Sequence, residues 1–204
     1  VFYPRIPGAE RHLVETAFIH GQQVGHADPG MYRGENLRLT DLQAKFRQDQ
    51  TSRTGIDRRD GFTKQMAAKH PNVKIVDIQY GGGDQLKSTD IAKAVIQSHP
   101  NLKGYFGANE GSIIGVLNAV KELKMDGKIT VIGYDSGKQQ IDAIKAGTEA
   151  GAITQDPIGI GYKCVEAAVK AIKGESVPKN IDTGFYWYDK SNIADPKIAA
   201  VLYQ

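Results

Sequence analysis

Four polar residues have the side chains best suited to contact a ligand: Arg58, Asn109, Asp135 and Gln155. They supply a planar cation, a carboxylate and two amides. That combination suits a ligand rich in hydroxyl groups, because each hydroxyl needs both a donor and an acceptor in a dry site. The set contains no nucleophile–base pair. The Gly-Gly-Gly-Asp run at residues 81–84 does not match a phosphate-binding loop, because the Lys-Ser pair that follows at residues 87–88 is preceded by Leu86 and not by the glycine that the motif requires.

Each of the four residues also has a simpler interpretation when taken alone. Arg58 could be a solvated helix charge, and Asn109 a turn former. The Asp135 carboxylate could serve only to interact favourably with the positive amino-terminal end of a neighbouring helix. Gln155 could be a loop residue before Pro157. These alternatives stay open for each residue singly. It is their common position at the ends of predicted strands that favours a binding site.

The elements that must position these side chains repeat along the chain from residue 49. Residues 104–108 form an apolar strand, Asn109 lies in the polar turn after it, and a helix opens at Ser112, which is half of a βαβ unit. Ligands of open α/β sheets gather where strand carboxyl ends meet helix amino ends. Ser136 and Gln139 suggest a capping box for a further helix. We predict helices over 55–69, 85–97, 112–124, 139–146 and 159–173, and strands over 73–79, 104–108, 129–134, 150–154 and 183–188.

This alternation predicts an α/β fold in which a parallel sheet carries helices on both faces. Residues 1–48 are the least readable part, with one helical candidate over residues 9–19. The sequence therefore assigns no fold to residues 1–48.

Composition excludes several function classes. The 204 residues carry a net charge of +3 without a basic run, which gives no case for nucleic acid or an anionic membrane. The single cysteine, Cys164, excludes an internal disulfide and a cysteine zinc cluster, and the histidine spacing predicts no metal site. We expect neither a metal nor a cofactor. Residues 1–20 show no signal-peptide pattern, which a mature secreted chain would also lack.

Four motifs resemble, in order and spacing, the type I periplasmic sugar-binding proteins, the ribose- and galactose-binding-like receptors of ABC transporters. They are DRRDGF (57–62), YFGANE (105–110), VIGYD (131–135) and TQDP (154–157). The resemblance covers about residues 49–204. It implies a hinged, two-lobed receptor that closes on a monosaccharide or polyol without chemistry. It also implies a periplasmic or extracellular location, delivery to a membrane permease, and sugar contacts by Arg58, Asn109, Asp135 and Gln155.

The sequence departs from that family in two places. Residues 81–83 are glycines where ribose receptors carry an aromatic residue, which leaves the identity of the sugar open. Only residues 1–48 stand where the family has a whole amino-terminal lobe. We therefore expect a truncated or rearranged first lobe in 1–48 and a sugar-binding-protein-like α/β lobe, resembling the second lobe, in 49–204. Residues 159–188 are expected to belong to, or face, the first lobe.

Two other functions fit the same fold. One is the effector-binding core of a sugar-responsive transcriptional repressor, which needs a helix-turn-helix before the core. Residues 12–30, with Pro29 and several glycines, do not provide one. The other is a small α/β enzyme, which the absence of catalytic pairs disfavours.

The predicted helix over 159–173 and strand over 183–188 carry an apolar surface, which we expect to be buried against another part of the chain or against a second copy. The helix places five small or apolar residues on one stripe: Ile160, Cys164, Val165, Ala168 and Ile172. The cover could come from residues 1–48, through Phe2, Tyr3, Leu13, Val14 and Phe18, or from a second copy. We favour a homodimer, since 48 loop-rich residues are few for building a sheet.

Overall fold

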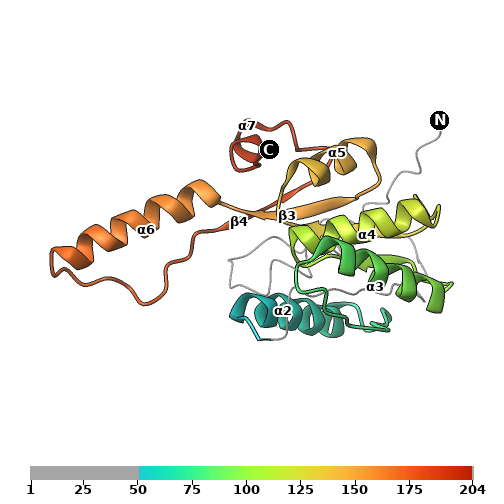
Figure 1. The fold of residues 1–204 in the computed structure, drawn as a ribbon. Coiled ribbons are helices and arrows are strands. Elements are labelled where there is room, and N and C mark those ends of the chain that lie inside the picture. Colours follow the sequence, from blue (N-terminus) through green and yellow to red (C-terminus); the bar gives the residue numbers. More distant parts are fainter. Residues whose placement is uncertain (1–50, 204) are drawn as a thin grey trace.

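The computed structural model describes residues 51–203. The predicted helix over 9–19 and the unassigned segment 1–48 lie outside this range. Helices and strands alternate along the described chain (Figure 1). In order they are α2 (Arg53–Lys69), α3 (Gln85–Ser98), β1 (Gly104–Phe106), α4 (Glu110–Glu122), β2 (Thr130–Tyr134), α5 (Lys138–Ala146), β3 (Gly151–Gln155), α6 (Pro157–Ile172), β4 (Phe185–Tyr188) and α7 (Pro196–Ala199).

The strands form one sheet in the order β1-β2-β3-β4. The first three are parallel, as the alternation predicts, and β4 pairs antiparallel with β3. An antiparallel strand at the edge of a parallel sheet is common in α/β folds. The predicted α/β class is therefore confirmed, with the aromatic strand running in the opposite direction to the others.

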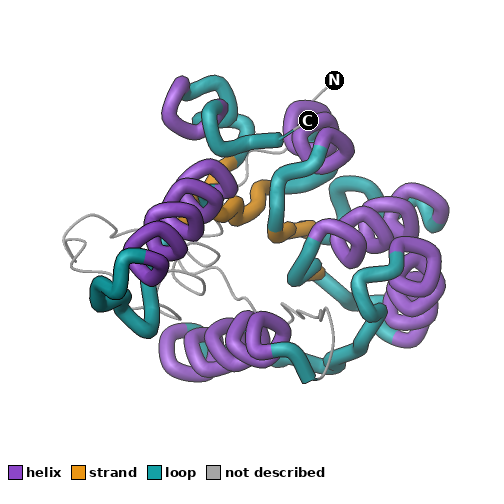
Figure 2. Tube along the Cα trace, turned by 60° about the vertical axis from the view of Figure 1, so that its left-hand side comes forward, coloured by secondary structure: helices purple, strands orange, loops and turns teal. Residues whose placement is uncertain are grey.

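Helices cover both faces of this sheet. On one face, Phe62 of α2 stacks on Phe106 of β1, with ring centroids 5.1 Å apart. On the other face, a Cβ atom added to Gly133 of β2 would meet Ile113, Gln140 and Glu149 within 3.0 Å. Glycine is therefore the residue that lets α4 and α5 approach β2 so closely. In Figures 1 and 2, α2 accordingly lies below the strands and α5 above them.

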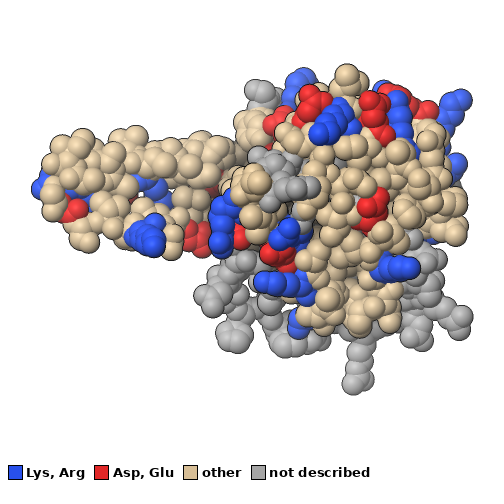
Figure 3. All heavy atoms as spheres, turned by 60° about the horizontal axis from the view of Figure 1, so that its bottom comes forward, with Lys and Arg blue, Asp and Glu red and all other residues tan. Residues whose placement is uncertain are grey.

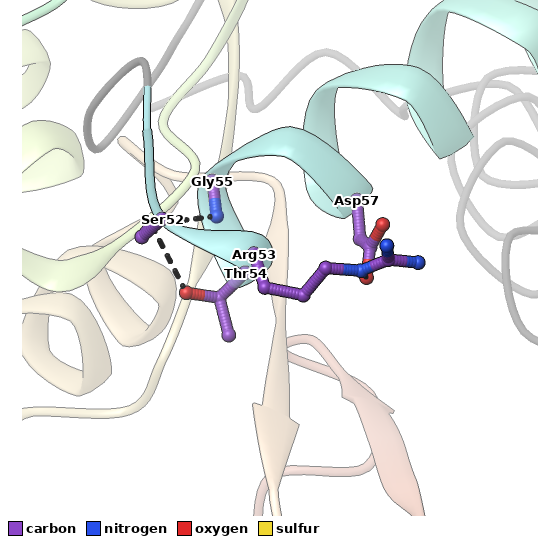
Figure 4. A network of polar contacts seen from close by, with 5 residues as sticks. All are labelled: Ser52, Arg53, Thr54, Gly55 and Asp57. Atoms are coloured by element: carbon purple, nitrogen blue, oxygen red, sulfur yellow. Dashed lines mark hydrogen bonds and ion pairs between the residues drawn. The ribbon is translucent and has the colours of Figure 1, made fainter.

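Helix α2 begins two residues before the predicted start, at a well-formed amino-terminal cap (Figure 4). The Ser52 hydroxyl accepts a hydrogen bond from the Gly55 amide at 3.1 Å, which satisfies one of the free donors of the first turn. Arg53 pairs with Asp57 one turn later, at 2.7 Å. The cap fixes the start of the helix and so the direction in which Arg58, on its second turn, leaves it.

Two predicted local features are wrong. Residues 73–79 form no strand; Val73, with Met66, Phe62 and Ile75, makes a small cluster against α2. The apolar residues there are partly buried without pairing, since Val76 packs against the main core cluster, and a strand also needs a hydrogen-bonded neighbour. The capping box is also absent: α5 starts after Gly137 without a side-chain cap, and the Ser136 hydroxyl pairs with that of Thr154 at 2.9 Å.

Helix α6 projects from the rest of the described chain (Figures 1 and 3), and none of its residues is buried. Its most exposed apolar residues follow a spacing of four, three, four and three: Ile158, Tyr162, Val165, Val169 and Ile172. Of the five residues of the predicted stripe, Cys164, Val165, Ala168 and Ile172 are exposed and Ile160 is half-buried. Among residues 51–203, no helix combines the length and the apolar character needed to cross a membrane.

Candidate ligand-binding site

Arg58 is held on three sides at the carboxyl end of the sheet. Its Nη1 donates to the Ala108 carbonyl at 2.7 Å, and its Nη2 donates to Gln155 Oε1 at 3.3 Å. The guanidinium also lies over the Tyr134 ring, 3.6 Å from its centroid, which is a cation–π contact. Arg58 is therefore not a freely solvated helix charge. The next residue, Arg59, turns instead to Asp60.

Asn109 is the amino-terminal cap of α4. Its Oδ1 accepts a hydrogen bond from the Ser112 amide at 3.0 Å, so the helix begins at Glu110 and not at Ser112 as predicted. The simpler interpretation of Asn109 as a local turn residue is thus correct for its side-chain oxygen, which hydrogen-bonds within the same turn. Its Nδ2 lies beside Gly83, 3.0 Å from where a Cβ atom of that residue would stand. The cap fixes the Asn109 side chain in place.

Asp135 directly follows β2 and adopts a left-handed backbone conformation, with φ of 78°. This turn lets its carboxylate reach the amino terminus of α4, where Oδ2 accepts from the Glu110 amide at 2.9 Å. Burial raises the pKa of the Asp135 carboxyl, while the Arg58 charge and the Glu110 N–H partly oppose that rise. The carboxylate therefore lies at the positive end of α4 and within the field of Arg58.

The structure thus gathers all four predicted residues at one edge of the sheet. Arg58 and Gln155 touch directly, Asp135 interacts electrostatically with Arg58, and Asn109 caps the helix that binds Asp135. All four are only partly buried, so each keeps some surface for a ligand. No group of three or more His, Cys, Asp or Glu residues within 51–203 is placed to hold a metal.

Sequence reasoning missed two parts of the site. Tyr134 supports Arg58, and its position one residue before Asp135 at the end of a strand was a usable signal. The register pairs Phe106 with Ile132, so alternation along β2 places Tyr134 on the same face, which is the face that α2 covers. Tyr188, whose hydroxyl donates to the Asp135 carbonyl at 2.7 Å, comes from an antiparallel strand and had no such signal.

The fold and these contacts can now be set beside known proteins. A family model described as "Periplasmic binding protein domain" matches residues 43–176. The chain belongs to this family. The resemblance inferred from the four motifs is therefore confirmed at the level of the family.

The relatives in this family include sugar receptors. The D-allose-binding periplasmic protein of Escherichia coli is 32% identical over 126 residues, which are 61% of this chain and 40% of that protein. The ribose import binding protein RbsB of Salmonella typhimurium is 33% identical over 145 residues, covering 71% and 46%. An ABC transporter solute-binding protein from Agrobacterium vitis, bound with α-D-tagatopyranose, superposes with a TM-score of 0.75 at 34% identity. That match covers 81% of this chain and 55% of the other. This chain spans about half the length of these proteins.

Proposed function

We propose that the rim formed by Arg58, Asn109, Asp135 and Gln155 binds a monosaccharide or polyol, without chemistry, as part of an ABC sugar transporter's solute-binding component. One observation carries the proposal. Arg58, fixed by Ala108, Gln155 and Tyr134, lies in the field of the Asp135 carboxylate at the carboxyl end of a parallel sheet. Ligands of such sheets bind at that edge.

The chemistry of the rim fits hydroxyl groups. Arg58 and Asp135 offer charge-assisted hydrogen bonds, which are stronger than neutral ones. Gln155 and Asn109 each carry an amide that can donate, and so add directional contacts. Their positions are fixed by helix caps and strand ends before any ligand arrives. Such preorganisation lowers the ordering cost of binding.

The finer parts of the proposal rest on the family. Two relatives are named as a ribose import protein and a periplasmic allose-binding protein, which supports delivery to a permease and a periplasmic or extracellular location. Residues 49–204 act as the second lobe of such a receptor, with residues 159–188 belonging to or facing the first lobe. The exposed stripe of α6 is covered by a second copy, which makes the chain a homodimer.

The proposal is tested by titrating the protein with D-ribose, D-allose, D-tagatose and D-arabinose, using NMR to reach weak affinities. For the sugar that binds, Asp135→Ala should weaken binding by about 2–4 kcal/mol, since an ionised acceptor leaves a partly buried network. Arg58→Ala should have a similar effect.

The matched control is Arg59→Ala on the same helix, which should leave the affinity unchanged because Arg59 pairs with Asp60. Equal affinity in wild type, Asp135→Ala and Arg58→Ala would show that the sugar does not bind at this rim.

A further inference from the structure

We propose that Tyr188 is a positioning residue for Asp135, whose backbone its hydroxyl holds in the conformation that aims the carboxylate at the rim. The proposal rests on the proposed function in one respect: Asp135 is taken as the ligand contact. The positioning itself is a property of the unliganded chain.

The first observation is the backbone of Asp135. A φ of 78° lies in the left-handed region, which residues with a side chain adopt uncommonly, although aspartate and asparagine do so more often than most. In the extended conformation of a strand, the alternation of side chains would place the Asp135 side chain on the face of Gly133, which α4 and α5 cover. In the left-handed conformation that Asp135 adopts, its Oδ2 accepts a hydrogen bond from the Glu110 amide at the first residue of α4.

The second observation is the set of contacts that holds this conformation. The Asp135 N–H donates to the Ile153 carbonyl at 2.7 Å, which extends the β2–β3 pairing by one residue. The Asp135 carbonyl accepts a hydrogen bond from the Tyr188 hydroxyl, also at 2.7 Å. The peptide groups on either side of the Asp135 Cα are thus both anchored, and Tyr188 supplies the second anchor.

The third observation is that Tyr188 is itself rigid. Its side chain is fully buried among Ile144 and Ala152, and the strand register pairs it with Ala152. Burial raises the pKa of its hydroxyl, and the surrounding acidic groups raise it further, so the hydroxyl remains a donor. A second tyrosine, Tyr203, accepts from the Ser136 amide at 3.3 Å and braces the next residue of the same loop.

A purely structural role for Tyr188 is the competing explanation, because its ring is also part of the core. Tyr188→Phe separates the two, since it keeps the ring and removes only the hydroxyl. The matched control is Tyr186→Phe, because Tyr186 lies on the same strand with an exposed side chain.

The test follows the Glu110 amide proton by NMR while the pH is lowered through the ionisation of Asp135. In the wild type, this proton should shift with that ionisation because it is hydrogen-bonded to Oδ2. In Tyr188→Phe, the shift should fall to less than half, and the pKa of Asp135 should rise as the carboxylate loses a donor. Tyr186→Phe should match the wild type. A Tyr188→Phe titration identical to that of the wild type overturns the proposal.

Two further variants cover the remaining outcomes. If Tyr188→Phe does not fold, the substitution Asp135→Gly is introduced into the same chain, because glycine adopts the left-handed conformation at no steric cost. Recovery of folding supports the proposal, and failure to recover overturns it.

In sugar titrations, the single variant Tyr188→Phe should bind several-fold more weakly than the wild type. The double variant Tyr188→Phe/Asp135→Gly should bind with the same affinity as the single variant Asp135→Gly. If Asp135→Gly binds sugar as well as the wild type, the proposed function fails while the NMR result still decides the role of Tyr188.

Discussion

At the residue scale, the site is built from side chains that are fixed before a ligand arrives. Arg58 donates hydrogen bonds to the Ala108 carbonyl and to Gln155, and its guanidinium lies over the ring of Tyr134. Asp135 is fixed through its amide, its carbonyl and its carboxylate. The positions of these side chains are therefore set by contacts within the unliganded chain.

A second carboxyl group lies under the rim and predicts a dependence of stability on pH. Glu149 is buried against Gly133, where Gln140 Nε2 donates to its Oε1 at 3.3 Å. Glu149 Oε2 and Gln140 Oε1 have no hydrogen-bond partner, and both are acceptors when Glu149 is ionised. A proton on Glu149 would supply the missing donor. Burial raises the pKa of Glu149 well above its ordinary value.

Because the folded pKa is raised, the folded state binds the proton more tightly than the unfolded state does. The resulting stability is fully present below the unfolded pKa of about 4.3 and is lost as the pH rises through the folded pKa. Within that window, the free energy of unfolding should fall by about 1.4 kcal/mol per pH unit.

Glu149→Gln should remove this slope, because an amide keeps the pairing without a proton. The measurement is urea unfolding of both proteins from pH 5 to pH 8, in steps of about one unit. The exposed substitution Glu175→Gln serves as the control and should keep the slope. Equal slopes in wild type and Glu149→Gln would show that Glu149 titrates alike in the folded and unfolded chain.

At the element scale, the sequence predicted the alternating elements of the described chain and the edge at which its polar side chains meet. Strand and helix periodicity located β1, β2 and β3 and the helices between them within a few residues. The strand expected over 73–79 failed because periodicity reports burial, not hydrogen-bond pairing. The capping box failed because the Ser136 hydroxyl pairs with Thr154 of β3 and the helix begins after Gly137. The antiparallel direction of β4, and with it Tyr188, depends on tertiary pairing that no local pattern encodes.

Helix α6 gives a prediction about association. Its exposed stripe, from Ile158 to Ile172, follows the four-three spacing that two helices use to pack along a common seam. Burying one large apolar side chain contributes about 1.5–3 kcal/mol, so several left in water favour association. We expect light scattering during size exclusion to give the mass of two chains.

Val165→Lys, in the middle of this stripe, should shift the protein to one chain mass. Lys163→Gln, off the stripe, should leave the dimer intact. A monodisperse wild-type monomer would contradict the dimer.

At the scale of the whole molecule, the chain spans about half the length of the relatives it matches. Tight sites bury about 70–90% of a small ligand. The rim of Arg58, Asn109, Asp135 and Gln155 contacts a ligand from one side, so by itself it offers only part of that enclosure. We therefore expect dissociation constants no better than about millimolar for simple sugars. Calorimetry that yields a micromolar constant for a monomer would show that other residues of the chain complete the enclosure.

The most direct test of the central claim, that this rim is a ligand-binding half-site, is chemical-shift mapping of isotope-labelled protein. D-ribose, D-allose and D-tagatose are each titrated to concentrations well above the expected dissociation constant. The account predicts that the largest perturbations fall on the side-chain signals of Arg58, Asn109 and Gln155 and on the amides of Asp135 and Glu110. L-arginine at equal concentration, lacking the array of hydroxyls, should not reproduce them. Perturbations confined to other surfaces, or none with any of the three sugars, would contradict it.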